Sequence, residues 1–84
     1  MKIIAEARDG TGAHCFDNVD QTMAVFAFKL RLANSVHTTA HSLRLFVFKE
    51  GTIPMEDNRI LGYYITSDRH LFYQRVQGQQ NNPN

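Results

Sequence analysis

The sequence has only one cysteine, Cys15, among its 84 residues. A single cysteine excludes an internal disulfide framework, and the scarcity of cysteine fits a reducing compartment. An excess of charge of one sign is also lacking, since nine Lys and Arg side chains stand against eight Asp and Glu, for a formal net charge of +1. Because there is no long basic run, we do not expect the chain to bind nucleic acid.

No hydrophobic run approaches the roughly 20 apolar residues that a membrane-spanning helix needs. Glu6, Arg8 and Asp9 interrupt the apolar start, so no signal peptide is expected either. The sequence therefore predicts a soluble intracellular protein, cytoplasmic or nuclear, that does not bind a membrane.

The length allows one domain with a modest core, which leaves few residues for a deep catalytic pocket. Six Phe and three Tyr side chains are still enough for a globular fold without disulfide bridges. The last segment, 77–84, reads QGQQNNPN and has no apolar side chain that a core would hold. We predict one domain over residues 1–76 and a disordered polar tail over 77–84.

Hydrophobic alternation predicts a half-buried strand over residues 1–8. Asp9-Gly10 follows it and is a strong hairpin signal, because both residues tolerate positive φ. Residues 11–16 are expected to return as a weaker second strand, whose register the sequence leaves open.

A helix is predicted over residues 23–33, with Asp20 or Thr22 as its N-cap. Apolar side chains at spacings of three and four form one stripe, which we expect to face the sheet. Its members are Met23, Phe26, Ala27 and Leu30.

Two further strands are predicted, over residues 43–49 and 70–76. Between them lie a loop over 51–58 and a segment, 60–65, that forms either a short helical turn or a short strand. The expected order is hairpin, helix, strand, turn, strand, an α+β domain in which the first and last strands lie side by side and parallel at the sheet centre.

An apolar residue, two acids, a turn residue, an arginine and a Leu-type anchor follow one another at Met55-Glu56-Asp57-Asn58-Arg59-Ile60-Leu61, before Tyr64 and the closing strand. In this segment, 55–71, the chain resembles the ubiquitin-like family, with weaker matches at Met1-Lys2-Ile3, Gly10 and Asp20-x-Thr22 and a few extra residues around 52–54. The resemblance implies a β-grasp fold of ββαββ order, a mixed sheet with one helix packed across it. It also implies a protein that binds other proteins.

The C-terminus departs from that family. Ubiquitin and its conjugated relatives end in Gly-Gly, whereas here Arg75-Val76-Gln77-Gly78 has a single glycine followed by six residues. On one interpretation Gly78 is one more residue of a polar tail. On the other it is the processed terminus of a covalent modifier, with 79–84 as its propeptide.

The resemblance places the main partner-binding surface on the outer faces of the third and last strands. If Leu43, Leu45, Leu71 and Tyr73 point inward, alternation turns their neighbours to solvent. The expected binding residues are Arg44, Phe46, Phe48, Phe72 and Gln74, flanked by Arg75. In a shifted register the Phe side chains would form the core instead, with the Leu side chains outside.

A second apolar surface is expected on the back of the helix, at Val25, Phe28 and Leu32. A helix that covers one side of a small sheet normally presents charged side chains to solvent. The apolar back therefore predicts either a homodimer, or another partner docked on the helix, or a covering loop over 36–42.

The remaining reactive side chains do not converge. Cys15 and the adjacent histidine would point to opposite faces of a strand, and Glu56-Asp57 is typical of a turn rather than an acid–base pair. No metal site is expected, because the histidines have no close ligand spacing: His14, His37, His41 and His70. We expect a non-catalytic protein-binding domain without metal or cofactor. A small enzyme or metal protein built around Cys15 is the alternative from another class.

Overall fold

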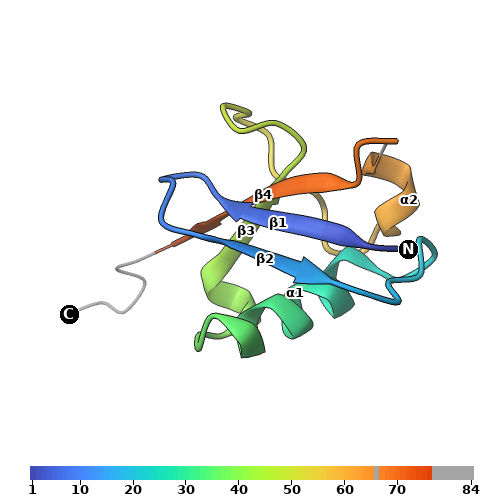
Figure 1. The fold of residues 1–84 in the computed structure, drawn as a ribbon, viewed down its shortest axis with the longest axis horizontal. Coiled ribbons are helices and arrows are strands. Elements are labelled where there is room, and N and C mark those ends of the chain that lie inside the picture. The colour runs from blue at the N-terminus through green and yellow to red at the C-terminus, as the bar shows by residue number, and fades with distance from the viewer. Residues whose placement is uncertain (66, 77–84) are drawn as a thin grey trace.

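The computed structural model describes residues 1–65 and 67–76, which form one four-stranded sheet with a helix across one face (Figure 1). Its elements follow in the order β1 (Ile3–Ala7), β2 (Ala13–Phe16), α1 (Val25–Ser35), η1 (Ala40–Ser42), β3 (Leu43–Phe46), α2 (Leu61–Tyr64) and β4 (His70–Arg75). The predicted α+β class is confirmed. The expected tail and Gly78 lie outside the described residues.

The first hairpin forms where the sequence predicts it. Gly10 has a φ of +80°, and its N–H donates to the carbonyl of Ala7 at 3.0 Å. The Asp9 carboxylate accepts the hydroxyl of Thr11 at 2.6 Å and its N–H at 3.0 Å. Because these bonds favour the ionised form, the hydroxyl bond foremost, the pKa of Asp9 is lowered from 3.8. The turn therefore sets an antiparallel register in which Ile3 lies opposite Phe16.

The strand order is β2-β1-β4-β3, so the first and last strands are the central pair. They run parallel, as predicted, with Ile4 beside His70 and Ala7 beside Tyr73. Strand β3 pairs antiparallel with β4 and ends at Phe46, three residues earlier than predicted. Residues 47–54 then leave the sheet as a loop, the yellow-green segment above β4 in Figure 1.

Helix α1 begins without a side-chain cap. Its first N–H groups reach a distant segment instead: the N–H of Val25 donates to the carbonyl of Arg59 at 2.8 Å, and that of Phe26 to the carbonyl of Asp57 at 3.1 Å. These bonds satisfy donors that the first turn of a helix leaves unpaired. The 57–59 segment thus takes the place of the predicted cap.

Asp20 and Thr22 form a local turn just before the helix. The Asp20 carboxylate accepts the N–H of Thr22 at 2.9 Å and its hydroxyl at 2.8 Å. The backbone bond, and then the hydroxyl bond, lower the pKa of Asp20 from 3.8. The prediction that either residue caps the helix is therefore wrong.

The core face of α1 is the stripe that contains Val25, Phe28 and Leu32, all of which have an exposed fraction of 0%. The prediction of a second apolar surface at these residues, and of a dimer formed through them, is therefore wrong. The predicted core stripe faces partly outward, since Leu30 is 52% exposed and Phe26 is half-buried against His41. In residues 1–65 and 67–76 no helix is long and apolar enough to cross a membrane.

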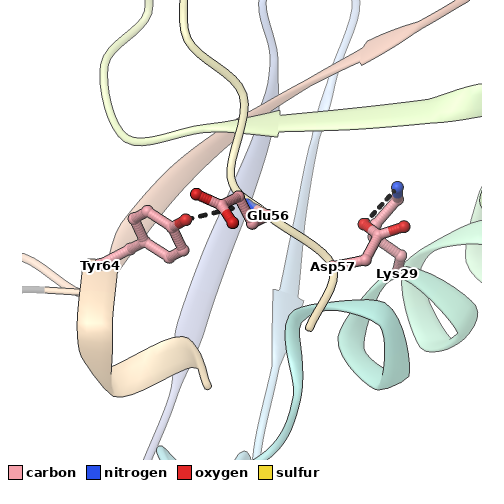
Figure 2. Close-up of polar contacts among 4 residues, drawn as sticks. All are labelled: Lys29, Glu56, Asp57 and Tyr64. Carbon is pink, nitrogen blue, oxygen red and sulfur yellow. Dashed lines mark hydrogen bonds and ion pairs between the residues drawn. The ribbon is translucent and has the colours of Figure 1, made fainter. Parts of the chain in front are cut away.

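The segment from Met55 to Tyr64 runs from β3, where Met55 bonds to Leu45, to the first turn of α1, where Arg59 bonds to Val25. Figure 2 shows its two polar anchors, the Lys29–Asp57 ion pair at 2.8 Å and the Tyr64 hydroxyl, which accepts the N–H of Glu56 at 2.9 Å. The 60–65 segment forms a short helix, the first of the two predicted forms, and Leu61 is fully buried. This segment joins α1 to the far edge of the sheet.

Candidate partner-binding surface

One face of the sheet is free of α1, and we call it the outer face. Its side chains alternate with the core residues along each strand. Rows run across it: Arg44 lies opposite Gln74, and Phe46 opposite Phe72, which lies beside Glu6 of β1. Three of the predicted binding residues of the strands, Arg44, Phe72 and Gln74, therefore have the predicted direction. Arg44 and Gln74 are exposed, and Phe72 is half-buried.

Phe46 has the predicted direction but is only 4% exposed. The guanidinium carbon of Arg8 lies 4.0 Å from the centre of the Phe46 ring, which is cation–π distance. Gly51 approaches the same ring, because a Cβ built on it would lie 3.8 Å from a ring carbon. The prediction that Phe46 is an exposed binding residue is therefore wrong. It is instead the base on which the loop rests.

The 47–54 loop is attached to this base by Arg8. The Nε of Arg8 donates to the carbonyl of Lys49 at 2.8 Å, and its Nη1 lies 3.4 Å from the Oε1 of Gln74. A turn closes the loop, with the N–H of Gly51 donating to the carbonyl of Phe48 at 3.1 Å. The guanidinium of Arg8 therefore contacts the loop, the Phe46 ring and β4 at the same time.

Two large apolar side chains project from this attached loop. Phe48 is 72% exposed and Ile53 is 84% exposed, the two highest values among the large hydrophobic side chains that the structure describes. Burial of such a side chain is worth roughly 1.5–3 kcal/mol. A partner that covered Phe48 and Ile53 would therefore gain a large hydrophobic contribution to its binding free energy. Phe48 was predicted, although on a strand, and Ile53 was not.

Phe72 lies in a small cluster of its own on the outer face. His70 stacks on it with ring centres 4.8 Å apart, and the Nε2 of His70 lies 3.0 Å from a carboxylate oxygen of Glu6. These contacts hold the Phe72 ring in place and leave it half-buried. An aromatic side chain that is already ordered loses little entropy when a partner covers it.

Cationic groups border the apolar part of the surface. Arg8 and Arg44 lie on either side of Gln74, and Arg75, which donates to the carbonyl of Val36, turns to the opposite side of the sheet. An open hollow of about 640 Å³ lies at the Arg8 end of this row, lined by Arg8, Gln74 and Arg75 together with Asp9 and Thr11 of the first turn. We call the set of Phe48, Ile53, Phe72, Arg44 and Gln74 the outer docking surface.

Sequence reasoning missed Arg8 and Ile53. Ile53 had a visible signal, since it is a large apolar residue inside the predicted 51–58 loop and outside every predicted strand and helix. Arg8 had none, because its contacts reach Lys49 and Gln74, which are distant in the sequence.

The reactive side chains remain apart. Within the described ranges, 1–65 and 67–76, no three His, Cys, Asp or Glu side chains lie close enough to hold a metal ion. Asp57 pairs with Lys29 (Figure 2). An oxygen of the Glu56 carboxylate lies 3.8 Å from the Nε of Arg59, so the two adjacent acids have different partners. Cys15 is exposed and unbridged on the edge strand.

No protein-family model and no curated protein matches this sequence.

Proposed function

We propose that this chain is a non-catalytic domain of the ubiquitin-like β-grasp type that binds other proteins through the outer docking surface. Three features support the fold: the hairpin–helix–strand–strand order, the parallel central pair β1 and β4, and the helix across one face. The first part, 55–64, of the segment that resembles the family, 55–71, connects the sheet to α1. An intracellular compartment fits the exposed, unbridged Cys15.

The observation that carries the function is the exposure of Phe48 and Ile53 on a loop that Arg8 attaches to the sheet. Exposed apolar patches bordered by polar residues are typical of interaction sites. Interface anchors are commonly aromatic and Arg side chains, and this surface offers Phe48, Phe72 and Arg44. Because the loop is attached, docking orders few additional residues.

The test is the double variant Phe48→Ser, Ile53→Ser. Both side chains are exposed, so we expect the free energy of unfolding to change by less than about 0.5 kcal/mol. Loss of two anchors is expected to weaken partner binding by at least about thirtyfold. Quantitative affinity capture from cells, followed by titration of the captured protein, measures this effect.

Leu30→Ser is the matched control, since Leu30 is also exposed but lies on α1, across the sheet from the loop. It should leave the captured proteins and their affinities unchanged. If the double variant captures the same proteins with the same affinity as the parent chain, the proposed surface is wrong.

A further inference from the structure

The 47–54 loop has few buried side chains that could hold its shape. Val47 and Gly51 are half-buried, and the other residues of the loop are exposed. A segment with so few buried contacts normally samples many conformations. Phe48 and Ile53 would then seldom face a partner in one fixed arrangement. The loop therefore depends on contacts from outside it.

Arg8 provides such contacts from a position directly after β1, where its own backbone is fixed in the sheet. The N–H of Arg8 donates to the carbonyl of Tyr73 at 2.9 Å. Its side chain reaches the loop, with the Nε 2.8 Å from the carbonyl oxygen of Lys49. The guanidinium carbon lies 4.0 Å from the centre of the Phe46 ring, and the Nη1 lies 3.4 Å from the Oε1 of Gln74. One side chain thus connects the loop to β3 and β4.

These contacts depend on the shape of the guanidinium group and not only on its charge. The guanidinium is planar, carries its donors in a fixed fork and can stack on an aromatic ring. Lysine carries the same charge at one point, so its ammonium group cannot keep all three contacts at once. A lysine at position 8 would therefore keep the positive charge and release the loop.

We propose, on the basis of the proposed function, that Arg8 is a positioning residue of the outer docking surface, which holds Phe48 and Ile53 in the arrangement that a partner recognises. Arg8 is half-buried and its guanidinium is already bonded to the loop, so it acts through the loop. A partner that binds a held loop loses little conformational entropy, whereas a partner that binds a released loop must also order it. The affinity of the surface is therefore set partly by a residue outside it.

The first test measures the order of the loop in the free protein, without any partner. Backbone NMR relaxation of the intact 84-residue chain gives order parameters for the amides of Phe48, Gly51 and Ile53. We expect values of about 0.8 in the parent chain and below about 0.6 in Arg8→Lys. Amide hydrogen exchange in β1 and β4 should change by less than about threefold, because the lysine releases the loop and not the sheet.

The second test measures affinity with linear peptides from a displayed library, selected on the parent chain. Only peptides that bind more weakly to the Phe48→Ser, Ile53→Ser variant are used, so that their binding depends on the loop. We expect Arg8→Lys to weaken their binding at least about tenfold. In the Phe48→Ser, Ile53→Ser background, Arg8→Lys should change the affinity by less than about twofold, because its effect passes through those two side chains.

Arg31→Lys is the matched control, because Arg31 makes the same kinds of contact elsewhere. Its Nη2 donates to the carbonyl of Asp17, and its guanidinium carbon lies 5.6 Å from the centre of the Phe16 ring. Arg31 lies on α1, across the sheet from the loop. The control should leave both the order of the loop and the affinity for the peptides unchanged.

Four outcomes would overturn the positioning role of Arg8 alone. In the first, the loop amides of the parent chain are already as mobile as those of Arg8→Lys. In the second, exchange in β1 and β4 rises together with loop mobility, which would make Arg8 a residue of overall stability. In the third, Arg8→Lys binds the peptides unchanged. In the fourth, it weakens them equally in the Phe48→Ser, Ile53→Ser background, which would make Arg8 a direct contact.

Failure of the proposed function has a different result. A library that yields no peptide sensitive to the Phe48→Ser, Ile53→Ser variant would overturn the outer docking surface itself, and the positioning role of Arg8 with it.

Discussion

His37 follows the last turn of α1 and has a left-handed backbone conformation, which residues other than glycine adopt less often. Its φ is +60°, and the N–H of Thr38 beyond it donates to the carbonyl of Ala33 at 3.0 Å. This is the Schellman arrangement, in which glycine is the usual residue at the left-handed position. The Cβ of His37 therefore introduces strain at the helix end.

Replacing His37 with glycine should stabilise the protein by about 0.5–1 kcal/mol, because relief of this strain exceeds the added entropy of the unfolded chain. Urea unfolding of the purified chain measures the change. The control is His37→Ala, which keeps the Cβ and should not gain stability. Equal stability of the glycine and alanine variants would contradict the assigned strain.

Phe46 shows what residue-scale reasoning can and cannot predict. Alternation correctly gives the direction of its side chain, because the period of a strand is local. Its exposure depends on Arg8 and Gly51, which come from outside the strand, and no local pattern reports them. The same alternation rule correctly predicts the directions of Arg44, Phe72 and Gln74, because the direction of a side chain on a strand depends only on the strand itself.

Helix α1 offers two apolar stripes, and the sequence favours the wrong one. The stripe of Val25, Phe28 and Leu32 also contains Lys29, which argues against burial of that face. In the folded protein Lys29 is 7% exposed and is paired with Asp57, a residue 28 positions away. A distant partner for one charge therefore decides which face of the helix meets the sheet.

The orientation of α1 can be tested with one substitution on each stripe. Phe28→Ala should lower the free energy of unfolding by about 3–5 kcal/mol, since Phe28 is fully buried and packs edge-on against Phe16. Leu30→Ala should lower it by less than about 1 kcal/mol, because Leu30 is half exposed. Chemical denaturation compares the two. A larger loss for Leu30→Ala would show that the helix packs in the other orientation.

At the scale of the whole molecule, the 55–64 segment connects parts that are distant in the chain. It caps α1 with two carbonyls, bonds to Leu45 of β3 and pairs with Lys29. Truncating Asp57 would leave a nearly buried ammonium group without its counter-ion. We expect Asp57→Ala to destabilise the protein by about 2 kcal/mol, a value reduced because Asp57 itself is half exposed.

A second substitution identifies the cause of that loss. Lys29→Met in the Asp57→Ala background removes the unpaired charge and keeps most of the side-chain volume, so it should recover much of the lost stability. Thermal unfolding of the two single variants and the double variant gives the coupling between the residues. Additive effects would contradict an ion pair that contributes to the fold.

The α+β class and the parallel central pair were predictable because each depends on local periodicity and on simple rules for connecting strands. The early end of β3 and the attachment of the 47–54 loop were not, because they depend on Arg8 contacting Phe46 and Lys49. The candidate surface was therefore predicted in direction and only partly in membership. Its most exposed member, Ile53, emerged from the three-dimensional arrangement.

The pairing of β1 with β4 joins residues 4 and 70, nearly the whole length of the described chain. During synthesis β1 leaves the ribosome before β4 and at first has only β2 to pair with, and a two-stranded hairpin alone is marginally stable in water. The pairing of β1 with β4 forms only after β4 has been made. The conformational entropy lost in closing the chain between them is therefore lost before their stabilising contacts form. Folding should therefore be a late, all-or-none event, and nascent chains that stop before β4 should remain open to chaperones and proteases.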